Sequence, residues 1–193
     1  MFYPLVNFED ERCILYLHGN AETRAQYHRR ALYKVFQDMG YHVLAIDYRG
    51  YGDSSKRTPS QTSMVEDGQA AFDWIQKHSH PSSIIFIWGH SLGTGVTSKL
   101  AHDLTHPKDG ESKFNKLSGL FLEAPFNRMV DEVKEFRISR ILPWIRIDID
   151  ETLNKADMAF DSTLWLKSVE VPILIMHAED DKVIPFYLGT IHK

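Results

Sequence analysis

The chain has 193 residues and a composition typical of a globular protein, with 43% hydrophobic and 25% charged residues. This length suits one domain with a core of its own, and the net charge of −4, without blocks of like charge, argues against a nucleic-acid partner. The single cysteine, Cys13, excludes an internal disulfide and a cysteine-rich metal site. No apolar run approaches the ~20 residues of a membrane-spanning helix, so we expect residues 1–193 to form one soluble domain.

The first half of the chain predicts a strand, a helix, a strand and a helix in turn. Residues 12–17 are rich in strand-forming side chains, whereas residues 22–39 have the periodicity of a helix. The apolar positions of that helix, four residues apart, are Tyr27, Ala31, Val35 and Met39, and Leu32 and Phe36 flank them. Residues 41–47 predict a second strand, and Ser63 and Glu66 have the spacing of a capping box at the start of the next helix.

The second half of the chain repeats this alternation. Residues 83–88 are apolar on both faces, as a central parallel strand requires, and residues 92–105 have the spacing of an amphipathic helix. Residues 117–123 and 171–177 predict two more strands. Alternating strands and helices predict an α/β fold with a mostly parallel, twisted sheet and helices on both faces.

Polar or glycine-rich segments follow every predicted strand. In chain order they read HGN, DYRGYGDS, GHSLG, EAPF and HAEDD. Ligands of open parallel sheets bind at the carboxyl ends of the strands. We therefore expect these five segments to converge on one functional edge of the sheet.

The segment between the last two strands, residues 127–161, is longer than its position requires. A crossover between parallel strands needs only ~10–12 residues, and this one combines charged and aromatic residues with a proline in EFRISRILPWIRIDID. We interpret the segment as a helical cap inserted over the functional edge. A longer crossover with extra helices is the alternative.

The segment GHSLG carries the clearest chemical signal. Gly89, His90, Ser91, Leu92 and Gly93 follow a buried strand and precede a helix, which is the context of a nucleophile elbow. A serine exposed at such a turn needs very small neighbours, because a Cβ atom two residues away would collide with the strand or the helix. The helix N-terminus then offers N–H groups to a developing oxyanion. We predict that Ser91 is a nucleophile; a structural glycine turn is the alternative.

A serine hydroxyl needs a base, and that base needs an acid to orient it. Two carboxylates, Asp180 and Asp181, follow the last predicted strand and are the candidate acids. Each has a second interpretation, as the N-cap of the helix that follows. The sequence shows no metal-ligand spacing, and this chemistry requires no metal and no organic cofactor.

Together these motifs resemble the α/β-hydrolase superfamily. The segments that carry the resemblance are YLHGNAETRAQYHR, LYKVFQDMGYHVLAIDYRGYGDS, FDWI, IWGHSLGTGV, LEAPF and ILIMHAEDDKVIPFYLG. Within the superfamily they look most like the lysophosphatidylserine and monoacylglycerol lipases of the α/β-hydrolase-domain type, over residues 12–190. The resemblance implies an α/β-hydrolase fold that is incomplete in this chain.

The resemblance also implies roles for individual residues. Asp181 fits the superfamily's pattern around the acid best, and Asp180 is the alternative acid. The backbone N–H groups of Asn20 and Leu92 would form the oxyanion hole. His18, in the same loop as Asn20, would be structural. The other residues implied to be structural are Asp47, Arg49 and Asp53.

The superfamily's catalytic histidine has no counterpart at its usual place. It follows the acid by several tens of residues, whereas this sequence continues for 12 residues after Asp181. The one histidine among them, His192, is expected on a surface helix that leads away from Ser91. We therefore expect a chain shortened at both ends relative to the family, with a degenerate complete protein as the alternative.

The resemblance implies a serine esterase that cleaves lysophospholipids or monoacylglycerols at a membrane surface, associated with the endoplasmic reticulum when full length. Two alternatives stay open: a catalytically impaired form that binds lipid or a partner, and a thioesterase that removes acyl groups from protein cysteines. The expected acyl-chain lining, unless these are ordinary core contacts of the cap, is Phe136, Ile138, Ile141, Leu142, Trp144 and Ile145. The candidates for contact with an anionic head group, unless they are merely solvated, are Arg128, Arg137, Arg140 and Arg146.

Overall fold

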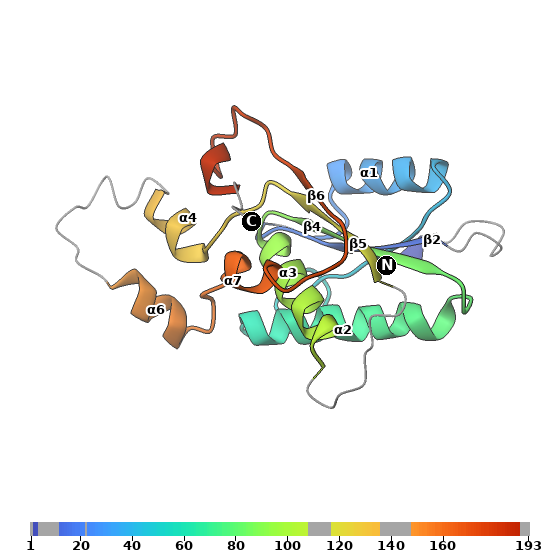
Figure 1. Cartoon of the computed structure of the whole chain (residues 1–193), viewed down its shortest axis with the longest axis horizontal. Helices are drawn as coiled ribbons and strands as arrows, with labels where there is room; N and C mark the ends of the chain where they lie inside the picture. Colours follow the sequence, from blue (N-terminus) through green and yellow to red (C-terminus); the bar gives the residue numbers. More distant parts are fainter. Residues whose placement is uncertain (1, 4–11, 22, 108–116, 136–147, 190–193) are drawn as a thin grey trace.

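The computed structural model describes residues 2–3, 12–21, 23–107, 117–135 and 148–189, and it contains a six-stranded sheet (Figure 1). The strands are β1 (Phe2–Tyr3), β2 (Arg12–Leu17), β3 (His42–Ala45), β4 (Ile84–His90), β5 (Leu117–Glu123) and β6 (Ile173–Met176). Their order across the sheet is β1-β3-β2-β4-β5-β6, with β1 antiparallel to β3 and every other pair parallel. This confirms the predicted α/β fold and its mostly parallel sheet.

Helices cover both faces of the sheet, also as predicted. The described helices are α1 (Tyr27–Asp38), α2 (Gln61–His78), α3 (Leu92–Thr105), α4 (Met129–Glu135), α6 (Ile149–Lys155), α7 (Ser162–Leu166) and a 3-10 helix (Phe186–Gly189). Figure 1 shows α1 on one side of the sheet and α2 and α3 on the other. The larger hydrophobic core lies on the α2 and α3 side, and a smaller one lies under α1. No helix in the described ranges is both long and apolar enough to cross a membrane.

The face of α1 that packs on the sheet differs from the prediction. Tyr27 is 86% exposed, and Val35 and Met39 are also exposed, so the four-residue stripe points to solvent. The buried aromatic residues are Phe36, a flanking position of the prediction, and Tyr33, which the prediction did not include. The Tyr33 ring lies 5.0 Å from that of Tyr16, and the Phe36 ring lies 4.8 Å from that of Trp88. The helix was predicted correctly but its buried face only in part, because aromatic partners on the sheet decide which side packs.

The start of α2 also lies one turn earlier than predicted. Ser60 is the N-cap, and its hydroxyl accepts a hydrogen bond from the Ser63 N–H. The Ser63 hydroxyl in turn accepts a hydrogen bond from the Ser60 N–H at 2.8 Å. Ser63 is therefore the last residue of the capping box, at the third position of the helix, rather than its first. Glu66 is exposed and pairs with Arg49 at 3.1 Å.

The segment predicted as a cap, residues 127–161, leaves the end of β5 and returns to α7. Its two ends meet in an antiparallel bridge between Arg128 and Asp161. Figure 1 shows α4 and α6 beyond the end of the sheet at which β5 finishes. The cap stays a prediction, because residues 136–147 lie outside the described residues. All six expected acyl-chain contacts lie there, as do three of the four arginines, whereas Arg128 pairs with Asp131.

Candidate active site

Ser91 lies at the turn between β4 and α3 in a backbone conformation that costs energy. Its φ is 52° and its ψ is −120°, a region that residues other than glycine rarely adopt. The Ser91 N–H donates to the Glu123 carbonyl at 2.9 Å, and the Ser91 carbonyl accepts hydrogen bonds from the N–H and the hydroxyl of Thr94. Neighbouring backbone therefore holds the strained turn at the carboxyl end of β4.

Three glycines lie where the backbone around Ser91 leaves no room for a side chain. A Cβ atom on Gly93 would overlap the Leu17 carbonyl oxygen, and one on Gly89 would lie 2.5 Å from the Gly93 carbonyl oxygen. A Cβ atom on Gly19, in the loop after β2, would lie 3.1 Å from the Ser91 Cβ atom. The steric requirement inferred from the sequence is thus present: strand, helix and neighbouring loop approach too closely for side chains.

The same approach places the two predicted oxyanion donors beside Ser91. Leu92 is the first residue of α3, where backbone N–H groups have no acceptor within the helix. Asn20 directly follows Gly19, and its side-chain oxygen accepts a hydrogen bond from the Tyr51 hydroxyl at 2.7 Å. Both residues are therefore next to the turn; their role as oxyanion donors stays a prediction.

His18 is part of the scaffold under this loop. It is fully buried, and its Nδ1 donates to the Gly19 carbonyl at 2.7 Å. Burial lowers the pKa of His18 to about 4, so the imidazole is neutral at pH 7. Its Nε2 lies 3.4 Å from the Asp47 carboxylate, and with a neutral ring this contact is not an ion pair. Asp47 instead pairs with Arg24, which also binds Asp53.

The carboxylate of Asp181 caps the turn after β6, and its role as the acid stays a prediction. Its Oδ1 accepts hydrogen bonds from the N–H groups of Val183 and Ile184, at 2.8 and 2.9 Å. Its Oδ2 lies 3.5 Å from Nε2 of the buried His177, which donates to the Ile184 carbonyl. One oxygen thus caps the turn, and the other retains capacity for a further donor. The alternative acid, Asp180, is exposed.

A half-buried carboxyl, Glu132 of α4, interacts with the charge of Asp181, and the sequence analysis did not identify it. Its Oε2 is buried, and no described residue offers it a hydrogen bond. Burial, followed by the charge of Asp181, raises the pKa of Glu132 to about 7. No pattern in the sequence singles it out, because its burial depends on contacts between α4 and the turn after β6.

The described residues do not identify the base. No hydrogen bond joins the Ser91 hydroxyl to a histidine within them, and His177 is occupied by Ile184. The Nδ1 of His90 lies close to Gly19, because a Cβ atom added to Gly19 would be 3.2 Å from that nitrogen. Burial lowers the pKa of His90, so its ring is neutral. His192 lies outside the described residues.

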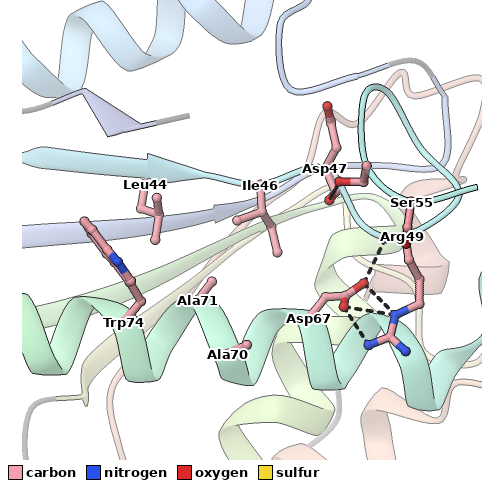
Figure 2. A pocket seen from close by; sticks show the side chains of 10 residues that line it. Leu44, Ile46, Asp47, Arg49, Ser55, Asp67, Ala70, Ala71 and Trp74 are labelled. Atoms are coloured by element: carbon pink, nitrogen blue, oxygen red, sulfur yellow. Dashed lines mark hydrogen bonds and ion pairs between the residues drawn. The ribbon is translucent and has the colours of Figure 1, made fainter.

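A groove of about 450 Å³ lies along α2 and β3, apart from Ser91. Figure 2 shows its apolar part over Leu44, Ile46 and Trp74 and its polar end at Asp67, whose carboxylate binds the Arg49 guanidinium at 2.7 Å. Ser91 does not line the groove, so it is not the acyl-chain pocket expected at the nucleophile. In the described ranges, no group of three His, Cys, Asp or Glu side chains is arranged to hold a metal ion.

Comparison with known proteins places this geometry among hydrolases. Residues 9–162 match the family described as serine aminopeptidase, S33. The chain is 40% identical over 198 residues to lysophosphatidylserine lipase ABHD12 of Mus musculus, covering 98% of this chain and 46% of that protein. It is 37% identical over 179 residues to protein ABHD12B of Homo sapiens, covering 91% and 47%. The chain therefore spans about half the length of these curated relatives.

Solved structures share the fold at low sequence identity. The esterase Est1E of Butyrivibrio proteoclasticus, solved with ferulic acid, has a TM-score of 0.70 at 16% identity and covers 97% of this chain and 78% of its own. A lipase-esterase related protein from Clostridium acetobutylicum has a TM-score of 0.66 at 16% identity, with coverage of 99% and 84%. At such identity the likeness concerns the fold alone.

Proposed function

Because the chain belongs to the α/β-hydrolase family described as serine aminopeptidase, S33, we propose that it hydrolyses acyl esters of lysophospholipids or monoacylglycerols through an acyl-enzyme on Ser91. The observation that carries the proposal is the strained Ser91, at a φ of 52° on a turn enclosed by three glycines. Strain of this kind is retained where a surrounding structure enforces it, and it is concentrated at functional sites.

In the proposed reaction, the Ser91 Oγ attacks the ester carbonyl and the N–H groups of Asn20 and Leu92 stabilise the oxyanion. A histidine base takes the hydroxyl proton and later gives it to the leaving alcohol, and water then releases the acyl group. Asp181 orients that histidine through its Oδ2. The described residues do not supply the base, so the proposal assigns this role to a histidine outside them.

The substrate class comes from the relatives. The proteins named lysophosphatidylserine lipase are about 40% identical to this chain, which supports a lipid ester with one acyl chain. The chain spans about half of their length, so the substrate class and the action at a membrane surface are parts of the proposal. A non-catalytic, lipid-binding role is the second candidate, and it is favoured by the absence of a histidine bonded to Ser91 among the described residues.

Hydrolysis of a substrate panel tests the proposal. We expect turnover of lysophosphatidylserine or a monoacylglycerol that is abolished in Ser91→Ala and falls by about 10⁴-fold in Asp181→Asn, which retains the capping oxygen. Asp180→Asn is the matched control and should keep full activity. Turnover that survives in Ser91→Ala would overturn the proposal, and binding without turnover would support the second candidate. A thioester cleaved in preference to the matched oxyester would favour a thioesterase.

A further inference from the structure

Arg29 of α1 is a buried cation close to the oxyanion loop. It is 3% exposed, whereas the next residue on the helix, Arg30, is exposed. A guanidinium is costly to bury unless hydrogen bonds and an opposite charge compensate it. No carboxylate among the described residues forms an ion pair with Arg29, and its Nε has no hydrogen-bond partner among them. Among the described residues, the charge of Arg29 is therefore compensated by hydrogen bonds and not by an ion pair.

The partners of Arg29 include the Tyr16 side chain and two carbonyl groups of the loop that follows β2. Its Nη2 donates to the Ala21 carbonyl at 2.9 Å, and its Nη1 donates to the Thr23 carbonyl at 2.6 Å. Ala21 directly follows Asn20, the proposed oxyanion donor. On the other side, the Tyr51 hydroxyl binds the Asn20 side chain at 2.7 Å. The loop that contains Asn20 is thus bonded both to α1 and to the loop after β3.

The charge of Arg29 reaches the groups that flank the reaction centre. Burial is the main reason for the lowered pKa values of His18 and His90, and the positive charge of Arg29 lowers both further. His18 precedes the glycine that packs on Ser91, and His90 precedes Ser91 itself. A positive charge in a water-poor site also stabilises a negative charge that develops nearby.

We infer that Arg29 is a positioning residue of the oxyanion hole. It holds the loop of Asn20 through the Ala21 and Thr23 carbonyls, and it places a positive charge close to the N–H group proposed to bind the oxyanion. This role rests on the proposed function of Ser91. It explains why a guanidinium is buried against backbone carbonyls, where an apolar side chain would pack at lower cost.

The test compares Arg29→Met and Arg29→Lys with Arg30→Met, a matched change at an exposed position of the same helix. The measurements are kcat and KM for p-nitrophenyl butyrate, with kcat divided by the number of sites that a fluorophosphonate titrates. We expect Arg29→Met to lower kcat per titrated site on the order of 100-fold with KM within twofold. Arg29→Lys should recover part of that loss, because it keeps the charge but not the fork of donors.

A purely structural role would lower the number of titratable sites and leave kcat per site unchanged, and that result would overturn the inference. If Arg29→Met does not unfold cooperatively, Arg29→Lys decides: a loss of kcat per site relative to Arg30→Met supports the role, and equality overturns it. Absence of Ser91-dependent turnover in the unsubstituted chain would overturn the proposed function, and the role of Arg29 with it.

Discussion

The turn that carries Ser91 and the turn that carries Asp181 lie at the same edge of the sheet but are held by different means. They follow β4 and β6, with β5 between these strands. The Ser91 turn has local hydrogen bonds from Thr94, and neighbouring strands also enclose it: the Glu123 carbonyl accepts from the Ser91 N–H, and the Leu17 carbonyl packs closely on Gly93. The Asp181 turn is fixed from within, by its own N–H groups and by His177. A strained geometry thus requires tertiary packing, whereas an unstrained one needs only local hydrogen bonds.

The largest expected effect follows from crowding at the Ser91 turn. Gly93→Ala would drive a methyl group into the Leu17 carbonyl oxygen, and backbone cannot yield as a side chain does. We expect a loss of about 3 kcal/mol in the free energy of unfolding, measured by urea denaturation. Gly68→Ala is the control, since its methyl would meet only the end of the Leu100 side chain, at 3.2 Å. Equal stability of Gly93→Ala and Gly68→Ala would contradict the inference that a neighbouring strand packs too closely on the Ser91 turn to admit a methyl group.

The next effect concerns the Asp181 turn and depends on pH. The folded state keeps the Glu132 proton up to about pH 7, whereas the ordinary pKa is 4.5. Between these values the folded state binds more protons, so the stability that this proton contributes falls as pH rises. Glu132→Gln does not titrate and should be more stable than the unsubstituted chain by about 2 kcal/mol at pH 8, and nearly equal to it at pH 4.

Urea denaturation at the two pH values checks this difference. His18 contributes a pH dependence of the opposite sign, because burial lowers its pKa, but it does so in both proteins and cancels in the comparison. A difference that stays constant from pH 4 to pH 8 would show that Glu132 is not a buried carboxyl beside Asp181.

The smallest expected effect is a difference in stability that reports the backbone strain at Ser91. Glycine adopts a φ of 52° at little cost, so Ser91→Gly should be more stable than Ser91→Ala by about 1 kcal/mol. At Ser98, inside α3, the same pair of substitutions should give the opposite order, since glycine weakens a helix by about 1 kcal/mol relative to alanine. The same order at both sites, in thermal or urea unfolding, would remove the evidence for strain.

The sequence predicts the features of this molecule that depend on residues close together along the chain. The alternation of strands and helices and the glycines around Ser91 are local patterns, and the structure contains both. The buried face of α1 was predicted only in part, because aromatic residues on the strands select it. Arg24 was missed because its partners lie 23 and 29 residues away in the sequence. Arg29 was missed because its partners include backbone carbonyls of a loop. The burial of Glu132 depends on two segments that meet only in the folded chain.

Labelling of the purified chain with a fluorophosphonate probe tests the central claim, that Ser91 is an activated nucleophile. Peptide mapping should find the probe on Ser91, with no labelling in Ser91→Ala and full labelling in Ser98→Ala. That result would mean that a base acts on Ser91 in this chain. A folded chain that takes up no probe, or takes it up equally in Ser91→Ala, would contradict the account.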